Sequence, residues 1–394
     1  MPSQAARKPS PTLPRNAAEL SLGLDGETPV FCFSANALKT RAELFKSGFK
    51  GDVTFAVKSN PSREVISTLA AAGFKSWDVA SVQEMELVRS IQPGAHFHYH
   101  NPVKSRIEIT RAYGEFNCRR YVVDCREELE KITTIVGEDR NIEIAVRLVL
   151  PRDRGASAHD FSTKFGAPEH IAMELLKKVK ALGFIPLLTF HPGSQSKDPQ
   201  TYARHIEAAA RIAKQASVEI TTLNVGGGFP ADYEYSKAPE PDVYFRVIEV
   251  ARDQHFAGMP LPKLECEPGR GLVAGCMSLL TCVKLVCSDG DDIFINDGIY
   301  GGLMEYGQLP ELKPPIRTIR KGKILEGPLK NWKVFGPTCD PMDVLPHRLD
   351  LPAALQDGDF IEFGMLGAYG ISTVTRFNGY GAFLIAPVTD VLKS

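Results

Sequence analysis

The stretch DVTFAVKSNPSREVISTLAAAG (residues 52–73) contains the unit from which most of the chain is built. Its first half is a short apolar run that predicts a strand, and its second half has the spacing of an amphipathic helix. Lys58 stands directly after the predicted strand, and Asn60 and Pro61 predict a turn before the helix. A lysine at that point either marks an ordinary surface boundary or holds an amine at the mouth of a site.

The same order of strand and helix recurs across about residues 35–268. The strand candidates are DVTFAVK (52–58), SWDVA (76–80), HFHYH (96–100), RRYVVDC (119–125), IEIAVRLVL (142–150), IPLLTFH (185–191), ITTLNV (220–225) and KLECE (263–267). Eight units of this kind predict a (β/α)8 TIM barrel, whose usual length is about 250 residues. A doubly wound open sheet is the alternative, because periodicity does not show whether a sheet closes.

The pattern changes at about residue 270, where long helical periodicity ends and strands and turns follow. The segments that show this change are 271–302, 330–340 and 359–370, and the early TPVFCFSA (28–35) resembles them. The predicted organisation is a tail at 1–17, a strand at 18–34 that joins the second domain, the barrel at 35–268 and a β-rich domain at 269–394.

Charge and composition exclude several classes of function. The formal net charge is −1, so no global field favours nucleic acid or an anionic membrane, and no apolar run approaches the length of a membrane span. The opening MPSQAARKPSPTLPRN (1–16) lacks the apolar core of a secretory signal. None of the eight cysteines forms a C-x-x-C pair, so we expect reduced thiols in a cytoplasmic protein and no metal site.

Chemically useful side chains recur where the predicted barrel strands end, which is where barrel enzymes place their sites. They are Lys58 after the first strand, Asp78 in the second, Arg147 in the fifth, His191 after the sixth, Gly226, Gly227 and Gly228 after the seventh, and Glu267 and Arg270 after the eighth. The three glycines lack Cβ atoms, so their amides can approach an anion such as a phosphate, although a plain glycine turn is the alternative.

Each of the other candidates also has an ordinary structural alternative. Asp78 could cap the following helix, and His191 could be a core histidine satisfied by the backbone. Glu267 could belong to a structural salt bridge, because a carboxylate at a barrel mouth is costly unless it is paired. Arg270 could lie on the surface or supply a fork of donors to a phosphate.

Nine motifs in order resemble the fold-type III pyridoxal-phosphate enzymes, and among them the ornithine/diaminopimelate decarboxylase family. The motifs are FAVKSN, WDVAS, FHPGSQ, GGGFP, EPGR, NDGIYGG, GPTCDPMD, GAYG and FNGYG, and they span nearly the whole chain after the tail. The resemblance implies an alanine racemase-like barrel with a β-rich domain, and pyridoxal 5'-phosphate as cofactor.

The resemblance also implies a role for each matching residue. Lys58 matches the lysine to which the cofactor is attached, and Glu267 matches the carboxylate that pairs with the cofactor's ring nitrogen. The remaining cofactor contacts that it implies are Asp78, Arg147, His191, Ser194, Gly226, Gly227, Gly228, Arg270 and Tyr369. Glu267 favours decarboxylation over racemisation, because related alanine racemases have an arginine there and a weaker electron sink.

The stretch GPTCDPMD supplies Cys339 and Asp340, which in this family reach into the neighbouring subunit's site. A homodimer with shared active sites is therefore implied. Cys339 would return a proton to the substrate's α-carbon, and Asp340 would bind the distal amine of a basic substrate. A buried structural thiol is the alternative for Cys339.

The chain departs from the best-known ornithine decarboxylases in two places. The acidic Tyr-Asp pair that follows their glycine-tyrosine motif is missing, and Glu305 or Glu311 would have to replace it, with Glu305 preferred. HPGSQ replaces HVGSG, so a proline removes one backbone donor near the phosphate, and Gln195 either compensates or contacts substrate.

The resulting hypothesis is pyridoxal-phosphate-dependent decarboxylation of L-ornithine to putrescine, with L-lysine to cadaverine as the second candidate. The alternatives are a diaminopimelate or carboxynorspermidine decarboxylase, an amino-acid racemase, and a non-catalytic regulatory relative. The first of these would need an arginine for a second carboxylate, and Arg147 has no assigned partner. The regulatory alternative is disfavoured because Lys58, Glu267 and Cys339 are all retained.

Overall fold

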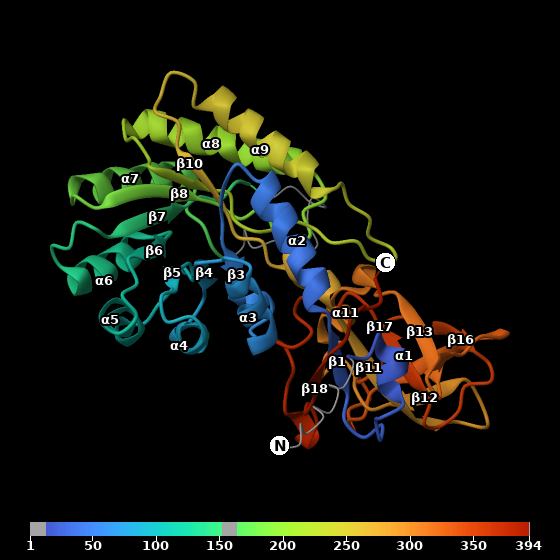
Figure 1. The fold of residues 1–394 in the computed structure, drawn as a ribbon. Helices are drawn as coiled ribbons and strands as arrows, with labels where there is room; N and C mark the ends of the chain where they lie inside the picture. The colour runs from blue at the N-terminus through green and yellow to red at the C-terminus, as the bar shows by residue number, and fades with distance from the viewer. Residues whose placement is uncertain (1–12, 152–163, 394) are drawn as a thin grey trace, which may run out of the picture.

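A computed structural model describes residues 13–151 and 164–393, which form two sheets of different kinds (Figure 1). One sheet is entirely parallel and is surrounded by helices, and the other is mostly antiparallel. This arrangement confirms the predicted fold class of a barrel joined to a β-rich domain.

The parallel sheet closes into a barrel. Its strands are β2 (Gly51–Val53), β3 (Phe55–Ala56), β4 (Ser76–Val79), β5 (His96–Tyr99), β6 (Arg120–Val123), β7 (Glu143–Arg147), β8 (Ile185–Thr189), β9 (Thr222–Asn224) and β10 (Lys263–Cys266). Their order is β2-β10-β9-β8-β7-β6-β5-β4-β3. Because β2 and β3 are consecutive parts of one run around Thr54, that run pairs with β10 on one side and β4 on the other. The open-sheet alternative is therefore wrong.

Helices cover the outside of the barrel (Figure 1). They are α2 (Ala35–Gly48), α3 (Arg63–Ala71), α4 (Val82–Ile91), α5 (Arg106–Gly114), α6 (Arg126–Val136), α7 (Glu169–Ala181), α8 (Gln200–Ala216) and α9 (Pro241–His255). Serines begin several of them. Ser62, Ser81 and Ser105 each accept an amide hydrogen bond from the first turn, and Ser105 forms a capping box with Glu108.

The second sheet belongs mainly to the C-terminal third of the chain. Its strands are β11 (Met277–Val286), β12 (Asp292–Ile295), β13 (Ile316–Arg320), β14 (Lys323–Ile324), β15 (Leu329–Phe335), β16 (Leu349–Pro352), β17 (Phe360–Phe363) and β18 (Leu384–Pro387), joined by the early β1 (Val30–Phe33). Strand β1 pairs antiparallel with β11 and parallel with β18. Two short helices complete the chain. Helix α10 (Arg270–Val273) connects the last barrel strand to β11, and helix α11 (Met304–Gln308) lies between β12 and β13 in the sequence.

The two ends of the described chain meet. Residues 1–12 of the predicted tail lie outside the described residues, but the carbonyls of Pro14 and Arg15 accept hydrogen bonds from Thr389 and Asp390. Asn16 then caps the short helix α1 (Ala17–Ser21). The folded structure therefore begins before residue 17, where the tail was expected to end.

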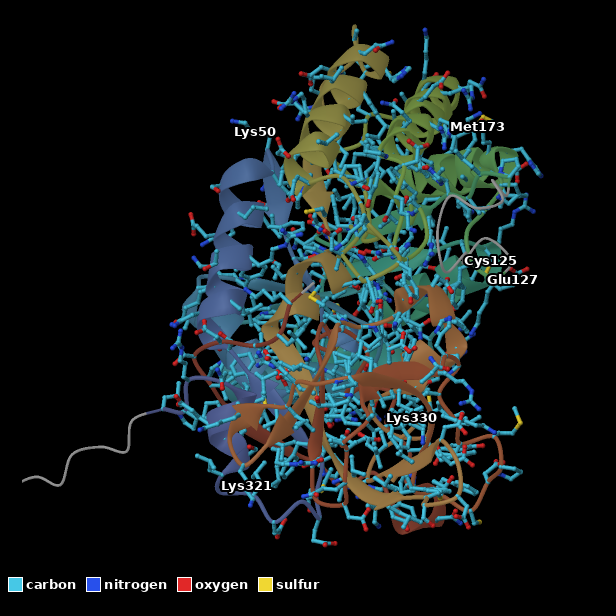
Figure 2. All side chains as sticks on the ribbon, turned by 90° about the vertical axis from the view of Figure 1, so that its right-hand side faces the viewer. Lys50, Cys125, Glu127, Met173, Lys321 and Lys330 are labelled. Carbon is cyan, nitrogen blue, oxygen red and sulfur yellow. The ribbon has the colours of Figure 1, made fainter. Side chains whose placement is uncertain are left out.

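Side chains fill both domains, as Figure 2 shows, whereas Lys50 and Lys321 project from opposite ends of the molecule. All eight cysteines lie in the described residues and none forms a disulfide; Cys125 and Cys287 are half-buried, Cys339 is exposed and the others are buried. Among residues 13–151 and 164–393, no helix is long and apolar enough to cross a membrane.

The seam where the barrel closes depends on Gly51. A Cβ atom at this position would lie 2.2 Å from the carbonyl oxygen of Leu264 on β10. Gly51→Ala should therefore lower the free energy of unfolding by about 1–3 kcal/mol, because the two strands must separate to admit the methyl group. Thermal unfolding measures this effect, and Gly94→Ala, where a Cβ meets nothing within 4 Å, is the matched control. Equal midpoints for the two variants would contradict the assignment of the seam.

Candidate active site

A cleft of about 440 Å³ opens at the C-terminal ends of the barrel strands, and both domains line it. A narrower recess adjoins it and shares Lys58, Asp78, His191, Ser194 and Tyr369 with it. Together the cleft and the recess are lined by Lys58, Asp78, His100, Arg147, His191, Ser194, Gly227, Gly228, Glu267, Arg270, Glu305 and Tyr369. The side chains predicted from the strand ends thus gather around one space.

Lys58 lies on a single 3-10 turn (Val57–Ser59) directly after β3. The turn is tied to the β-rich domain, because Asn60 Nδ2 donates to Gly367 O at 2.7 Å and Tyr369 N donates to Ser59 O at 2.8 Å. Lys58 itself is 45% exposed in the cleft, with its Nζ 3.8 Å from Asp78 Oδ2. The turn therefore presents the lysine to the cleft, which makes it more than a surface boundary.

Glu267 follows β10 and carries a buried carboxylate held by two neighbours. Its Oε1 accepts a hydrogen bond from Asn224 Nδ2 at 2.5 Å and lies in close contact with His100 Nδ1. Burial alone would favour the neutral acid, but His100 outweighs it and lowers the pKa of Glu267 to about 2. The surroundings of Glu267 therefore favour its ionised form in the recess.

A second buried carboxylate, Glu265, lies one layer below Glu267. Arg120 Nη1 donates to Glu265 Oε2 at 2.5 Å, and His98 Nδ1 lies 3.3 Å from Glu265 Oε1. Asn224 Nδ2 also donates to Glu265 Oε1 at 2.7 Å, so one amide links the two carboxylates. Despite its burial, the pKa of Glu265 is lowered by the adjoining His98 and Arg120. The barrel mouth thus contains alternating charges that offset much of each other's desolvation cost.

The glycine loop forms one wall of the recess. Cβ atoms on Gly227 and Gly228 would lie 2.8 Å from Glu267 O and 2.5 Å from Gly193 O. Within the described residues, neither of these two glycine amides donates a hydrogen bond. Ser194 faces the same wall, and its Oγ accepts from Arg270 at 3.3 and 3.4 Å. Free amides beside a hydroxyl and a guanidinium suit a phosphate group.

Arg270, which the sequence predicted as a phosphate contact, is paired with a carboxylate in this structure. Both of its terminal nitrogens contact the Glu305 carboxylate, with Nη1 at 2.7 Å from Oε2, and Nη1 also donates to Tyr233 Oη at 2.8 Å. Glu305 lines the cleft, but the prediction that it is oriented toward a substrate's distal amine does not agree with this pairing. The reason is tertiary, since helix α11 places Glu305 against the buried guanidinium of Arg270.

His191 and Arg147 also line the cleft, and His191 lies beside the glycine loop, with its Nε2 3.1 Å from where a Cβ atom on Gly227 would be. Burial, with the nearby charges of Arg147 and Lys58, lowers the pKa of His191 well below its usual value. Its Nδ1 accepts a hydrogen bond from Gly193 N at 3.1 Å. The imidazole is therefore neutral at physiological pH, and a neutral flat ring can pack against an aromatic ligand.

Cys339 and Asp340 lie away from this chain's own cleft. Cys339 is exposed, and its Sγ lies 3.3 Å from Asn378 Oδ1. Tyr300 Oη donates to Asp340 Oδ2 at 2.5 Å and lowers the pKa of this carboxyl. Neither residue lines the cleft or the recess, so one chain does not bring them to Lys58.

The site also contains residues that were not predicted from the sequence, among them His100, Lys164, Tyr233 and Gln308. His100 ends a predicted strand, as Lys58 and His191 do, so its position at a strand end could have identified it.

The contacts of Gln195 show which of its two predicted positions it takes. Its side-chain amide exchanges hydrogen bonds of 2.5 and 3.0 Å with Ala231, so it positions a loop instead of touching the cleft.

Comparison with known proteins agrees with this geometry. The family model "Pyridoxal-dependent decarboxylase, pyridoxal binding domain" matches residues 35–274. The chain belongs to the pyridoxal-dependent decarboxylases. A lysine/ornithine decarboxylase of Selenomonas ruminantium is 31% identical over 350 residues, which cover 86% of this chain and 83% of the relative.

A second sequence relative and one solved structure are also similar to this decarboxylase. Antizyme inhibitor 2 of Xenopus laevis is 30% identical over 349 residues, covering 83% of this chain and 73% of the relative. The solved structure of a lysine/ornithine decarboxylase from Vibrio vulnificus, complexed with cadaverine, superposes with a TM-score of 0.79 at 27% identity. That match covers 94% of this chain and 97% of the other.

The residues of the recess fit pyridoxal phosphate. Lys58 offers an amine for the aldehyde, and the ionised Glu267 offers a partner for the ring nitrogen. The free amides of Gly227 and Gly228, with Ser194, suit the phosphate. The enzyme is a pyridoxal-phosphate-dependent amino-acid decarboxylase, as the sequence predicted.

The charge cluster predicts how stability depends on pH. Burial and the neighbouring Glu267 raise the pKa of Asp78 to about 7, so the folded protein keeps a proton there that the unfolded chain releases near pH 4. In the cofactor-free protein this residue should lower the free energy of unfolding as the pH rises from about 4 to about 7, by at most about 1.4 kcal/mol per pH unit.

Asp78→Asn removes this proton, so its unfolding free energy should decline less steeply than that of the parent protein across the same window. Denaturant unfolding at half-unit pH steps measures both slopes. Parallel curves would show that the Asp78 carboxyl titrates in the folded state as it does in the unfolded chain.

Proposed function

We propose that this enzyme decarboxylates a basic amino acid, with L-ornithine as the preferred substrate and putrescine as the product. L-lysine, which would give cadaverine, is the second candidate. The related Selenomonas protein is described as acting on both, and the Vibrio structure holds cadaverine. The absence of a disulfide among the eight cysteines fits a reducing, cytoplasmic setting for this reaction.

The observation that supports decarboxylation most directly is the ionised carboxylate of Glu267. When bound, pyridoxal phosphate withdraws electrons from the substrate's α-carbon, and a protonated ring nitrogen strengthens that withdrawal. Glu267 presents an anion where that proton must be held, and its Oε2 accepts no hydrogen bond from any described residue. An arginine at this point, as expected for a racemase, would oppose the proton.

The other residues of the cleft position and shield the reacting atoms. Lys58 would hold the cofactor through its amine and release it when the substrate amine takes its place, and Asp78 lies 3.8 Å from that amine, where it could take up or return a proton. The neutral His191 would pack against the flat ring of the cofactor, and Arg147, which lines the same cleft, would offer a cation to a carboxylate.

The distal amine of the substrate needs an anion, and the proposed anchor is Asp340 of a second chain. Cys339 is exposed and Asp340 is half-buried, and neither lines its own chain's cleft, which fits a homodimer in which each chain completes the other's site. Cys339 would then return the proton to the α-carbon. Glu305 is paired with Arg270, so it could bind the substrate's distal amine only after a phosphate takes its place on Arg270.

Diaminopimelate is the alternative substrate, because two cations line the cleft. Arg147 and Lys164 both line it, and either could hold a second carboxylate. The antizyme inhibitor among the relatives makes a regulatory function the other alternative. Against it, the cleft retains the lysine, the buried carboxylate and the glycine loop that the reaction needs.

Carbon dioxide release by the holoenzyme tests this proposal. The panel is L-ornithine, D-ornithine, L-lysine, L-arginine and meso-diaminopimelate, with Lys58→Ala as the inactive control. We expect release from L-ornithine first and L-lysine second. Release from diaminopimelate alone would assign Arg147 or Lys164 as the distal contact, and release from none would favour the regulatory function.

Shared sites are tested by mixing two inactive variants. Lys58→Ala and Cys339→Ala disable different halves of each proposed site, so a mixed dimer should contain one intact site. Random exchange of subunits should restore about a quarter of the parent activity. Exchange is verified separately with two affinity tags, and exchange without recovered activity would show that Cys339 serves its own chain or no site at all.

A further inference from the structure

His100 lies at the centre of the charged groups in the recess. It follows β5, only 6% of its side chain is exposed, and its Nδ1 contacts Glu267 Oε1. The same nitrogen lies 3.9 Å from Asp78 Oδ1. Because an ionised carboxylate accepts at Nδ1, that nitrogen carries a proton, whereas the buried Nε2 has no hydrogen-bond partner among the described residues.

The groups that face His100 come from several strands. Glu267 and Glu265 come from β10 and its end, Asp78 from β4, His98 from β5, and Lys58 from the turn after β3. Three of these five are carboxylates, and burial makes every uncompensated charge costly. Asn224 links Glu265 and Glu267, but its amide is neutral and offsets no charge.

We propose that His100 is a positioning residue that acts as a buried imidazolium, keeping Glu267 ionised and turned so that its free oxygen meets the cofactor's ring nitrogen. The hydrogen-bond partners of Glu267 explain how its carboxylate is oriented. The Nδ1 contact occupies Oε1 together with Asn224, which leaves Oε2 for the ring. This inference rests on the pyridoxal site and does not depend on which amino acid is the substrate.

The titration of His100 agrees with this arrangement. Burial opposes its charge, but Glu267 and then Asp78 outweigh burial and raise the pKa of His100. Without the imidazolium, Glu267 and Asp78 would be two buried carboxylates close together, and such pairs share a proton. A proton on Glu267 would remove the anion that the ring nitrogen requires.

Nitrogen-15 NMR of the cofactor-free protein tests the charge state directly. In histidine-labelled protein, the His100 signals are identified by their loss in His100→Asn, and we expect the imidazolium form at pH 7.5, above the usual pKa of about 6.5. A neutral imidazole at that pH would overturn the proposal. So would a spectrum that changes on chelation, since Asp78, His100 and Glu267 donor atoms lie within 4.8 Å of one another and could hold a metal ion.

Cofactor binding separates the charge from a purely structural role. At pH 7, His100→Asn should weaken pyridoxal phosphate binding to the cofactor-free protein by about tenfold, which is about 1.4 kcal/mol. The difference in cofactor affinity between His100→Asn and the parent protein should become smaller at higher pH. There His100 of the parent loses its proton, and Glu267 of the variant ionises without help from an imidazolium. His96→Asn, an exposed position on the same strand, is the matched control and should bind like the parent protein.

A rescue experiment completes the test. His100→Ala should bind pyridoxal phosphate weakly at pH 7 and recover when imidazole is added, because imidazolium can occupy the vacated volume. Circular dichroism and thermal unfolding confirm that each variant is folded. Parent-like binding by His100→Asn, or a loss that is constant with pH and insensitive to imidazole, would overturn the proposal whatever substrate the enzyme uses.

Discussion

The site depends on the closure of the barrel between its first and last strands. Thr54 N donates to Cys266 O at 2.9 Å, and Ala56 N donates to Pro268 O at 3.3 Å. These bonds continue the pairing of β2 with β10 past the end of β2. Lys58 and Glu267, which are far apart in the sequence, therefore emerge on the same rim and reach one recess.

Closure also collects carboxylates in a place where water is largely excluded. Desolvation would drive each of them to its neutral form, and the barrel mouth counters this with cations placed beside them. Arg120 stabilises Glu265, and His100 stabilises Glu267. Asp78 receives less compensation and keeps a pKa of about 7. The same rim thus holds a permanent anion and a carboxyl that can exchange a proton near neutral pH.

The β-rich domain supplies what the barrel lacks. Tyr369 lines the recess and α11 lines the cleft, and the hydrogen bond from Tyr369 N to Ser59 O joins the domains beside Lys58. The pairing of Arg270 with Glu305 gives the phosphate-binding side a carboxylate that a phosphate would have to displace or accommodate.

Local patterns in the sequence determined the strands, their count and the side chains that follow them, because the apolar period and the turn residues act over a few positions. Lys58, Asp78, His191, the glycine loop and Glu267 all came from that reading. Contacts between distant segments were decided only by the tertiary structure. The partner of Arg270, the loop held by Gln195 and the contact of His100 with Glu267 each join residues that share no local pattern. Sequence spacing specifies which residues reach a rim, but the closed barrel and the docked second domain decide which charges meet there.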